Sequence, residues 1–310
     1  MGNPAMQQIF LGVSPKNLAA PPFAPYFTAA QERPLSVYFP VEGPGKLAVP
    51  PNIAGYIGSD TLGCVLATGM YRDEKMTLMI DIGTNGEMVL GNRDRMTACS
   101  TAAGPALEGG RICCGMRGSD GAIDHVWLEN GKAACSVIGN TKAQGICGSG
   151  IIDAAAAMLD LGILNKRGRI EKEYSGEGKD RRYSLTERVF LTQEDIREIQ
   201  MAKGAIAAGI ILLAKQLGIT LEEIDQVILC GAFGNYMKPE SACGIGLIPA
   251  ELQGKIKAGG NGAGMGSREM ALDREKLYLT DRLLKKTEFI ELASIPEFQR
   301  VYASNMMFHP

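Results

Sequence analysis

The chain has 310 residues, of which 45% are hydrophobic and 21% charged, and its formal net charge is -2. A chain of this length and composition can bury a large core and is long enough for more than one domain. Its lysines and arginines are scattered, so the composition indicates neither a nucleic-acid partner nor an anionic membrane surface. The longest apolar run, residues 205–214, is too short to cross a bilayer, and no signal-like segment opens the chain. We therefore expect a cytoplasmic protein.

The number and spacing of the cysteines and histidines limit the kinds of metal site that the chain could form. The eight cysteines stand at positions 64, 99, 113, 114, 135, 147, 230 and 243, with no Cys-x-x-Cys pair. This spacing matches neither a disulfide framework nor a zinc or iron–sulfur cluster. His125 and His309 are the only histidines, which excludes a histidine-rich metal site. We expect buried, reduced thiols, with redox chemistry at the adjacent Cys113 and Cys114 as the alternative.

The first part of the chain is rich in proline and aromatic residues. Residues 1 to about 50 show little periodicity, but their apolar residues need somewhere to pack, so we expect an ordered connection and not a free linker. Residues 49–70 predict a short strand, a glycine-rich turn and a helix. The charged stretch 71–75 then marks a boundary before a second unit.

The second unit begins with strands. Residues 78–82, 87–90 and 95–99 predict three antiparallel strands joined by tight turns. A hairpin around Asn130-Gly131 and a helix from Gly150 to about Leu161 follow. The charged segment 165–188 is expected to be a solvated excursion.

The remainder alternates between helices and strands. Thr192 and Asp195 form a helix-capping pair, and the apolar spacing after them predicts a long core-packed helix. A strand at 226–230, a short helix, a strand near Ile256 and a helix beyond Gly266 come next. Three antiparallel strands followed by this alternation predict an α/β fold, the RNase H-like unit shared by actin-type ATPases and sugar kinases.

Two glycine-rich turns repeat in outline. Residues 51–59 and 260–267 each follow an extended segment and precede a helix. We therefore expect two matching lobes, of which residues 1–72 supply only the tail of the first. Residues 76–310 are expected to form a complete carboxy-terminal RNase H-like lobe.

The first candidate site is the turn Asp81-Ile-Gly-Thr-Asn-Gly-Glu87. Gly83 lacks a side chain, so backbone N–H groups can approach phosphate oxygens, and Thr84 and Asn85 can donate hydrogen bonds. Asp81 can hold magnesium directly or through water. An Asn-Gly hairpin with a strand-end aspartate is the purely structural alternative.

Two further turns are candidates for nucleotide contacts. Gly148, Ser149 and Gly150 open a helix, whose unpaired N–H groups favour an anion, although glycines there also serve helix packing. The turn at Gly231, Ala232, Phe233, Gly234 and Asn235 follows a buried strand and leaves space for a flat ring.

Lys203 is a charged residue in the apolar stripe of the long helix. Its ammonium group can reach a ribose or phosphate of a nucleotide. The alternative is a lysine that only extends from the core into solvent.

Four sequence segments, taken together, indicate a protein family more specifically than any one of them does alone. They read Ile80-Asp-Ile-Gly-Thr-Asn-Gly-Glu87, Ala98-Cys-Ser-Thr-Ala-Ala-Gly-Pro105, Gly145-Ile-Cys-Gly-Ser-Gly-Ile-Ile-Asp153 and Gly231-Ala-Phe-Gly-Asn-Tyr236. They closely resemble the carboxy-terminal region of the reductive activators of corrinoid proteins. Pro50-Pro-Asn-Ile-Ala-Gly55 and Gly2-Asn3 resemble that family's middle region, so the resemblance covers nearly the whole chain.

The resemblance implies an ATPase of the acetate and sugar kinase, heat-shock chaperone and actin class. Such proteins use ATP to help move an electron from a ferredoxin-type donor onto cobalt(II) of a corrinoid methyltransferase protein, which restores cobalt(I). By motif, Asp81, as the catalytic and magnesium-binding residue, belongs with Gly83, Thr84 and Asn85 to a phosphate loop. Residues 231–235 look like the adenosine loop. ATP and magnesium are the implied cofactors, and a [2Fe-2S] cluster is expected only in an amino-terminal ferredoxin domain.

Two departures from the family pattern stand out. The sequence has no cysteine set for a [2Fe-2S] cluster, and a first-lobe phosphate turn would precede Gly2. We therefore expect part of a longer protein, or help from another polypeptide, with weak ATP binding and little or no activity alone. A sugar or acetate kinase type of phosphotransferase and a non-catalytic docking module for a corrinoid protein are the alternatives. The oligomeric state is open, a homodimer included.

A partner loop is the last expectation. Residues 99–109 follow a core strand and are mostly small or polar, with glycines at intervals. This composition suits a loop at the surface. We hypothesise that it docks on the corrinoid protein, with the hydroxyl of Ser100 or Thr101 near the cobalt. The alternative is a loop that closes the nucleotide cleft.

Overall fold

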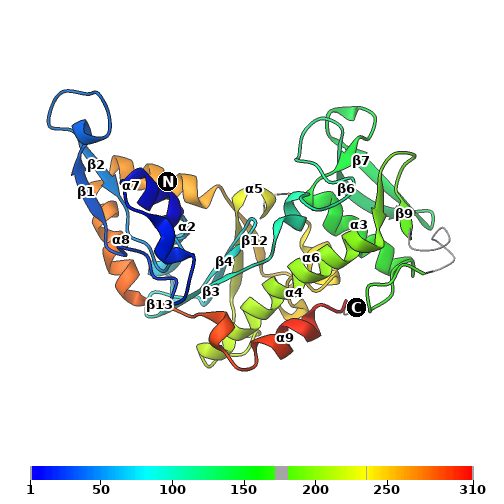
Figure 1. The fold of residues 1–310 in the computed structure, drawn as a ribbon. Helices are drawn as coiled ribbons and strands as arrows, with labels where there is room; N and C mark the ends of the chain where they lie inside the picture. Colours follow the sequence, from blue (N-terminus) through cyan, green and yellow to red (C-terminus); the bar gives the residue numbers. More distant parts are fainter. Residues whose placement is uncertain (1, 172–180, 235, 309–310) are drawn as a thin grey trace.

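The computed structural model describes residues 2–171, 181–234 and 236–308 (Figure 1). In Figure 1 a sheet in the middle of the molecule separates a group of helices with the β1–β2 hairpin from a second group built around α3, β6 and β7. Within the described ranges, no helix combines the length and apolar character needed to span a membrane.

The central sheet has six strands in the order β12-β11-β3-β4-β5-β13. Their bounds are Thr77–Ile82 (β3), Gly86–Gly91 (β4), Met96–Thr101 (β5), Gln226–Cys230 (β11), Ile256–Gly260 (β12) and Thr287–Phe289 (β13). β3, β4 and β5 are antiparallel neighbours, whereas β11 lies parallel to β3, β12 to β11, and β13 to β5. The three antiparallel strands and the parallel strands beside the first confirm the predicted RNase H-like order.

Helices cover both faces of this sheet. Their bounds are Ser59–Thr68 (α2), Gln193–Gln216 (α4), Gly262–Leu272 (α7) and Arg274–Lys286 (α8). Leu78 and Ile80 of β3 share one core with α4, whereas Met79 shares a second core with α2, α7 and α8. This division follows from the strand geometry, because successive side chains point to opposite faces.

The amino-terminal segment contains elements that its composition did not predict. Asn3 accepts hydrogen bonds from two backbone N–H groups and caps helix α1 (Pro4–Phe10), and β1 (Gln31–Pro34) pairs with β2 (Lys46–Val49). The connection expected to be ordered over residues 1–50 thus contains a helix and a pair of strands. Proline at the first helical position favours a helix start, so this local signal was available in the sequence.

Helix α2 packs directly on the sheet of the second unit. Its buried residues share a core with β3, β4 and α8, and a Cβ at Gly266 of α7 would overlap the backbone of Gly63. Close backbone contact of this kind needs glycine at the crossing. The lobe boundary near residues 72–76 stays a prediction, but the core is continuous across it.

A smaller sheet with the order β7-β6-β8 lies on the other side of the molecule. It comprises β6 (Ala122–Glu129), β7 (Lys132–Val137) and β8 (Gly145–Ile146), and it packs on α3 (Gly148–Asp160). The predicted hairpin at Asn130-Gly131 joins β6 and β7. Helix α3 begins two residues before the predicted Gly150, because Cys147 rather than Ser149 is its N-cap.

The long helix and its capping pair are confirmed. Thr192 and Asp195 form a reciprocal capping box at the start of α4. The short strands β9 (Arg182–Ser184) and β10 (Phe190–Thr192) pair before α4, and β9 lies within the segment 165–188 that was predicted to be a solvated excursion. The other α-helices in the described ranges are α5 (Gly231–Gly234), α6 (Pro239–Gly244) and α9 (Phe298–Asn305). Short 3-10 turns lie at Pro15–Leu18, Leu35–Val37, Met70–Arg72, Pro105–Glu108, Ile138–Asn140, Ala250–Leu252 and Leu292–Ser294.

Candidate functional site

A row of polar residues crosses four strands of the central sheet. The strand registers place Cys230 of β11 beside Asp81 of β3, Asp81 opposite Glu87 of β4, and Glu87 opposite Ser100 of β5. Directly paired residues on neighbouring strands point to the same face. Cys230 belongs to the core shared with α2, so the row lies on the α2 face.

Helix α2 adds the side chains of Cys64 and Asp60 to this row, which already includes Ser100 of β5. The thiol of Cys64 donates to Oδ2 of Asp81 at 3.6 Å, and the hydroxyl of Ser100 donates to Oε1 of Glu87 at 3.3 Å. Asp60, in the first turn of α2, lies close enough to repel both Asp81 and Glu87. The sequence motif identified Asp81, but only the packing of α2 reveals Asp60 and Cys64.

Three carboxyl groups in this cluster have a raised pKa. Burial, together with the neighbouring Asp60, raises the pKa of Asp81. Burial, then Asp60 and Asp81, raises the pKa of Glu87 to about 7, and burial raises the pKa of Asp60. Like charges that share a desolvated site favour protonation, and a bound cation would relieve this repulsion.

Gly231 lies directly against Asp81. Its φ is +84°, and a Cβ there would stand 2.7 Å from Oδ1 of Asp81. A side chain at this position would therefore be strained and would crowd the carboxylate. This contact brings the first and third candidate turns together, at adjacent ends of the parallel pair β3 and β11. Gly234 is buried in α5, Asn235 lies outside the described residues, and the side chains of Ala232 and Phe233 are likewise not described.

The turn after β3 has space for a ligand at Gly83. A Cβ there would meet nothing closer than 3.8 Å, where the nearest atoms belong to Asn85 and Glu108. The hydroxyl of exposed Thr84 donates to Oε2 of Glu108 at 2.6 Å, and its carbonyl accepts from the N–H of Gly104 at 2.8 Å. Glu108 is thus a site residue that sequence reasoning missed, because it is 24 positions from Thr84.

A pocket of about 650 Å³ joins the first and second turns. Ile82 and Glu108 line it together with Gly148 and Ser149 at the start of α3. The side chain of Cys147, the N-cap residue of this helix, makes no capping hydrogen bond to its first N–H groups. Such a helix start is suited to an anion. Gly150 also has a packing role, because a Cβ there would overlap the carbonyl of Ile123.

Lys203 lies in a different environment from the one expected. It is fully buried, and its ammonium group donates to the carbonyls of Asn305 at 2.6 Å and Met307 at 2.7 Å. Burial lowers its pKa to about 8. The alternative that Lys203 extends into solvent is therefore wrong. A nucleotide contact of Lys203 stays a prediction. Among the described residues, its ammonium group also donates to the carbonyl of Gly246 at 3.5 Å.

The structure corrects the placement of Ser100 and Thr101. Both belong to β5, not to a surface loop, which begins only after Thr101. The side chain of Thr101 is buried, and its hydroxyl donates to the carbonyl of Gly86 at 3.4 Å. β5 ends two residues later than predicted because its pairing with β4 continues to Thr101 and Gly86. A role of these hydroxyls in partner binding stays a prediction.

A buried carboxylate beside the second turn was not assigned any role by the sequence. Oδ2 of Asp153 contacts Nδ1 of His125 at 3.0 Å and Nζ of Lys238 at 3.2 Å. Its Oδ1 has no hydrogen-bond partner among the described atoms. Asp153 stands in α3 one turn after Ser149, so it fixes the position of this helix start against β6.

Residues 75–310 match the family model for the C-terminal domain of RACo, the ASKHA domain, and residues 1–73 match the RACo middle region. The chain belongs to the RACo family. This assignment confirms the resemblance and the fold class, since the ASKHA domain is the ATPase fold expected from the strand and helix order.

Two curated RACo-family relatives and one solved structure agree with this assignment. The chain is 38% identical over 331 residues to "Corrinoid activation enzyme RamQ" of Eubacterium limosum, covering 99% of this chain and 55% of that protein. It is 30% identical over 289 residues to "[Co(II) methylated amine-specific corrinoid protein] reductase" of Methanosarcina barkeri, covering 85% and 52%. A solved "Reductive activator for corrinoid,iron-sulfur protein" matches with a TM-score of 0.88 and 33% identity, covering 99% and 51%. The chain thus spans about half the length of the relatives it matches.

Proposed function

We propose that this chain is the ATP-dependent part of an activator that promotes reduction of cobalt(II) to cobalt(I) in a corrinoid methyltransferase protein. The observation that carries the proposal is the contact of Gly231 with Asp81. This contact brings the candidate phosphate turn after β3 and the candidate adenosine turn after β11 together at one edge of the sheet in an ASKHA domain. The names of the relatives supply the reaction class.

The residues of the site fit a nucleotide. The pocket between Glu108 and Ser149 combines an uncapped helix start with the open backbone at Gly83. Backbone N–H groups in both places would bind phosphate oxygens. We propose that residues 231–235 hold the adenosine and that the bond from Thr84 to Glu108 fixes the orientation of the phosphate turn.

The carboxylates of the site fit magnesium. No group of three or more described acidic, cysteine or histidine residues is arranged to hold a metal alone. Magnesium in nucleotide sites needs only one or two carboxylates, because phosphates and waters supply the other ligands. Asp81 would hold it, directly or through water. The bound ion would neutralise phosphate charge and relieve the repulsion among Asp60, Asp81 and Glu87.

Coupling to cobalt reduction requires an electron donor and a corrinoid protein. We propose a ferredoxin-type [2Fe-2S] centre outside these residues as the donor. The role of ATP is then to favour a conformation of the activator in which the corrinoid protein binds and accepts the electron. The 310 residues alone should bind ATP only at millimolar concentration, because a second phosphate turn is needed to enclose the triphosphate.

Two measurements test the proposal. Calorimetry of this chain with ATP and Mg²⁺ should detect weak binding, and Asp81→Asn should abolish it. Addition of the chain to a cobalt(II) corrinoid protein, with an iron–sulfur donor and ATP, should increase the cobalt(I) absorbance above an ATP-free control. Phosphoryl transfer to a sugar or acetate would favour the kinase alternative. Absence of any nucleotide effect together with tight corrinoid-protein binding would favour a docking module.

A further inference from the structure

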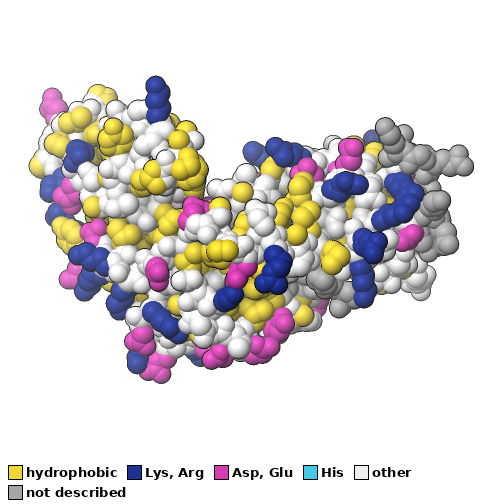
Figure 2. All heavy atoms as spheres, turned by 60° about the horizontal axis from the view of Figure 1, so that its bottom comes forward, with side chains coloured by type: hydrophobic (Ala, Val, Ile, Leu, Met, Phe, Trp, Pro, Cys, Tyr) yellow, Lys and Arg dark blue, Asp and Glu magenta, His cyan; other side chains and the backbone are white. Residues whose placement is uncertain are grey.

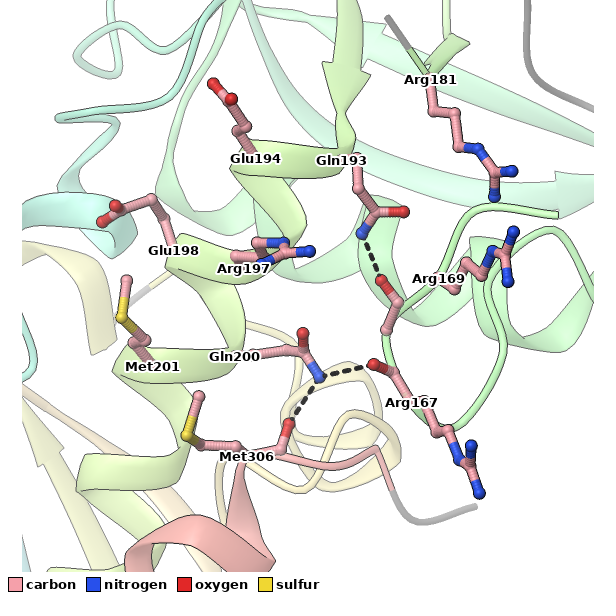
Figure 3. Close-up of a pocket in the computed structure, with 11 residues that line it drawn as sticks. Arg167, Arg169, Arg181, Gln193, Glu194, Arg197, Glu198, Gln200, Met201 and Met306 are labelled. Atoms are coloured by element: carbon pink, nitrogen blue, oxygen red, sulfur yellow. Dashed lines mark hydrogen bonds between the residues drawn. The ribbon is translucent and has the colours of Figure 1, made fainter. Parts of the chain in front are cut away.

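A second pocket, of about 960 Å³, lies beside the first half of α4 (Figure 3). It shares no lining residue with the nucleotide pocket. Four arginines line it, together with two glutamates, two glutamines and two methionines: Arg167, Arg169, Arg181, Arg197, Glu194, Glu198, Gln193, Gln200, Met201 and Met306, with Gly168. The proposed nucleotide chemistry makes no use of this pocket.

The loop that carries Arg167 and Arg169 is held in place by α4. Gln193 donates to the carbonyl of Gly168 and accepts from the N–H of Ile170, and Gln200 donates to the carbonyls of Arg167 and Met306 (Figure 3). Gly168 has a φ of +78°, and a Cβ there would overlap the side-chain amide of Gln200. The loop is therefore preorganised, which reduces the entropy lost when a ligand binds.

The charges in the pocket are arranged asymmetrically. In Figure 3, Arg169 and Arg181 lie on one side and Arg197 extends toward them from α4, whereas Glu194 and Glu198 lie on the opposite side. No ion pair joins these four arginines to a carboxylate within the described ranges. Arg181 donates to the backbone carbonyl of Ile170 at 3.0 Å. No described carboxylate thus neutralises the charge of these arginines.

The surroundings favour carboxylates over a phosphate group. The capping box already satisfies the start of α4, and the exposed Glu194 in its first turn would repel a compact dianion there. Arg167, Arg169 and Arg197 are exposed and Arg181 is half-buried, and each has a planar fork that matches one carboxylate. Met201 and Met306 add adaptable apolar surface to the pocket.

The lining of the pocket carries more positive than negative charge, with four arginines and two glutamates. Figure 2 shows Lys and Arg side chains gathered over the right-hand part of one face, although the whole chain has a net charge of -2. This is the side on which α4 begins in Figure 1. A local concentration of positive charge on an acidic protein attracts and orients an acidic partner surface.

We propose that this arginine pocket docks an acidic, carboxylate-bearing segment of a partner protein. The segment lies across Arg169, Arg181 and Arg197, and the glutamates on the opposite wall set its direction by repelling its acidic end. The proposal does not rest on nucleotide binding or on cobalt chemistry, since it uses none of the residues assigned to them.

The probe is a fluorescein-labelled peptide of eight alternating Glu and Gly residues, measured by fluorescence anisotropy with the full chain at low salt. Arg169→Gln and Arg197→Gln should each weaken binding about fivefold, the effect of roughly one exposed charge pair. Glu198→Gln should tighten it about twofold, because it removes a repulsion. Arg282→Gln is the matched control, since Arg282 is an exposed arginine of α8 outside the pocket.

Binding should also fall as ionic strength rises, and a Gln–Gly peptide should not bind. Gly168→Ala should weaken binding through the loop and leave the charge unchanged, provided that circular dichroism shows a folded protein. Equal losses in Arg169→Gln and Arg282→Gln would overturn the proposal, because they would indicate nonspecific charge attraction. Competition by pyrophosphate at lower concentration than the peptide would overturn it in favour of a phosphate site. No peptide binding up to millimolar concentration would also reject it.

Discussion

The thiol of Cys64 and the carboxylate of Asp81 come from different units of the chain and meet at 3.6 Å. A hydrogen bond with Cys230, burial, and the neighbouring carboxylate of Asp81 raise the pKa of the Cys64 thiol, so it stays protonated and acts as a donor. This donor lowers the pKa of Asp81 against the larger effect of burial. Helix α2 therefore tunes the carboxylate proposed to hold magnesium.

Cys64→Ala should raise the pKa of Asp81 further and so weaken Mg²⁺-dependent ATP binding, about threefold near pH 6.5. Cys64→Ser keeps a donor at this position and should bind more nearly like the wild type. Titration calorimetry between pH 6 and 8 measures the difference, which should shrink as pH rises. An unchanged pH profile in Cys64→Ala would mean that the thiol does not tune Asp81.

Glu87 should make the stability of the ligand-free protein depend on pH. Its pKa is about 7 in the folded chain against 4.5 as the ordinary value, so the folded state binds more protons between these two pH values. Its stabilising contribution is fully present below pH 4.5 and is lost as pH rises to 7 and above. The expected loss is about 2 kcal/mol, since the full shift sets an upper limit.

Urea unfolding at several pH values between 5 and 7.5 measures this loss. Glu87→Gln cannot ionise, so its free energy of unfolding should change less over the same range. Glu288→Gln, at an exposed position on β13, is the control and should follow the wild type. Parallel pH profiles for wild type and Glu87→Gln would contradict the assignment.

Gly231 and Gly254 form a matched pair for testing the contact with Asp81. Their φ angles are +84° and +82°, but a Cβ at Gly254 would meet no atom within 4 Å. Alanine should cost about 1 kcal/mol at either position because of the left-handed backbone. Gly231→Ala should cost more and should also abolish ATP binding, because its methyl group crowds Asp81.

Thermal unfolding and calorimetry with ATP distinguish these effects. The prediction fails if the two alanine variants are equally stable and bind ATP equally well, since backbone strain would then be the whole effect.

Lys203→Met should destabilise the protein by about 3 kcal/mol. The change removes, at a fully buried position, the donor to the carbonyls of Asn305 and Met307 and leaves these two acceptors without it. Lys285→Met removes a lysine from an exposed position of α8 and should change stability by less than about 0.5 kcal/mol. Chemical denaturation measures both.

The pH dependence of Lys203 has the opposite sign to that of Glu87. Its pKa is lowered from 10.5 to about 8, so the unfolded chain binds more protons between these values. Stability from this group should therefore rise with pH over this window in the wild type and not in Lys203→Met. A wild-type profile that falls from pH 8 to 10 while Lys203→Met stays flat would refute the assignment.

The central sheet could be predicted well from local patterns. The strands around Asp81 and the long helix after Thr192 have alternating or helical apolar spacing and clear turn or cap residues, and these signals act over a few positions. Helix α1 was missed because its seven residues are too few to show a period, and the extension of β5 to Thr101 depends on pairing with β4.

By itself the sequence determined the RNase H-like order of elements, the membership of Asp81 and Gly231 in glycine-rich turns, and the family resemblance. Each is carried by adjacent residues, whose backbone preferences and spacing are local properties. Only the tertiary structure decided that Asp60 and Cys64 approach Asp81, that Glu108 binds Thr84, and that Lys203 is enclosed by carbonyls. These contacts join distant positions, and burial of the groups, which sets their pKa values, exists only after the helices pack on the sheet.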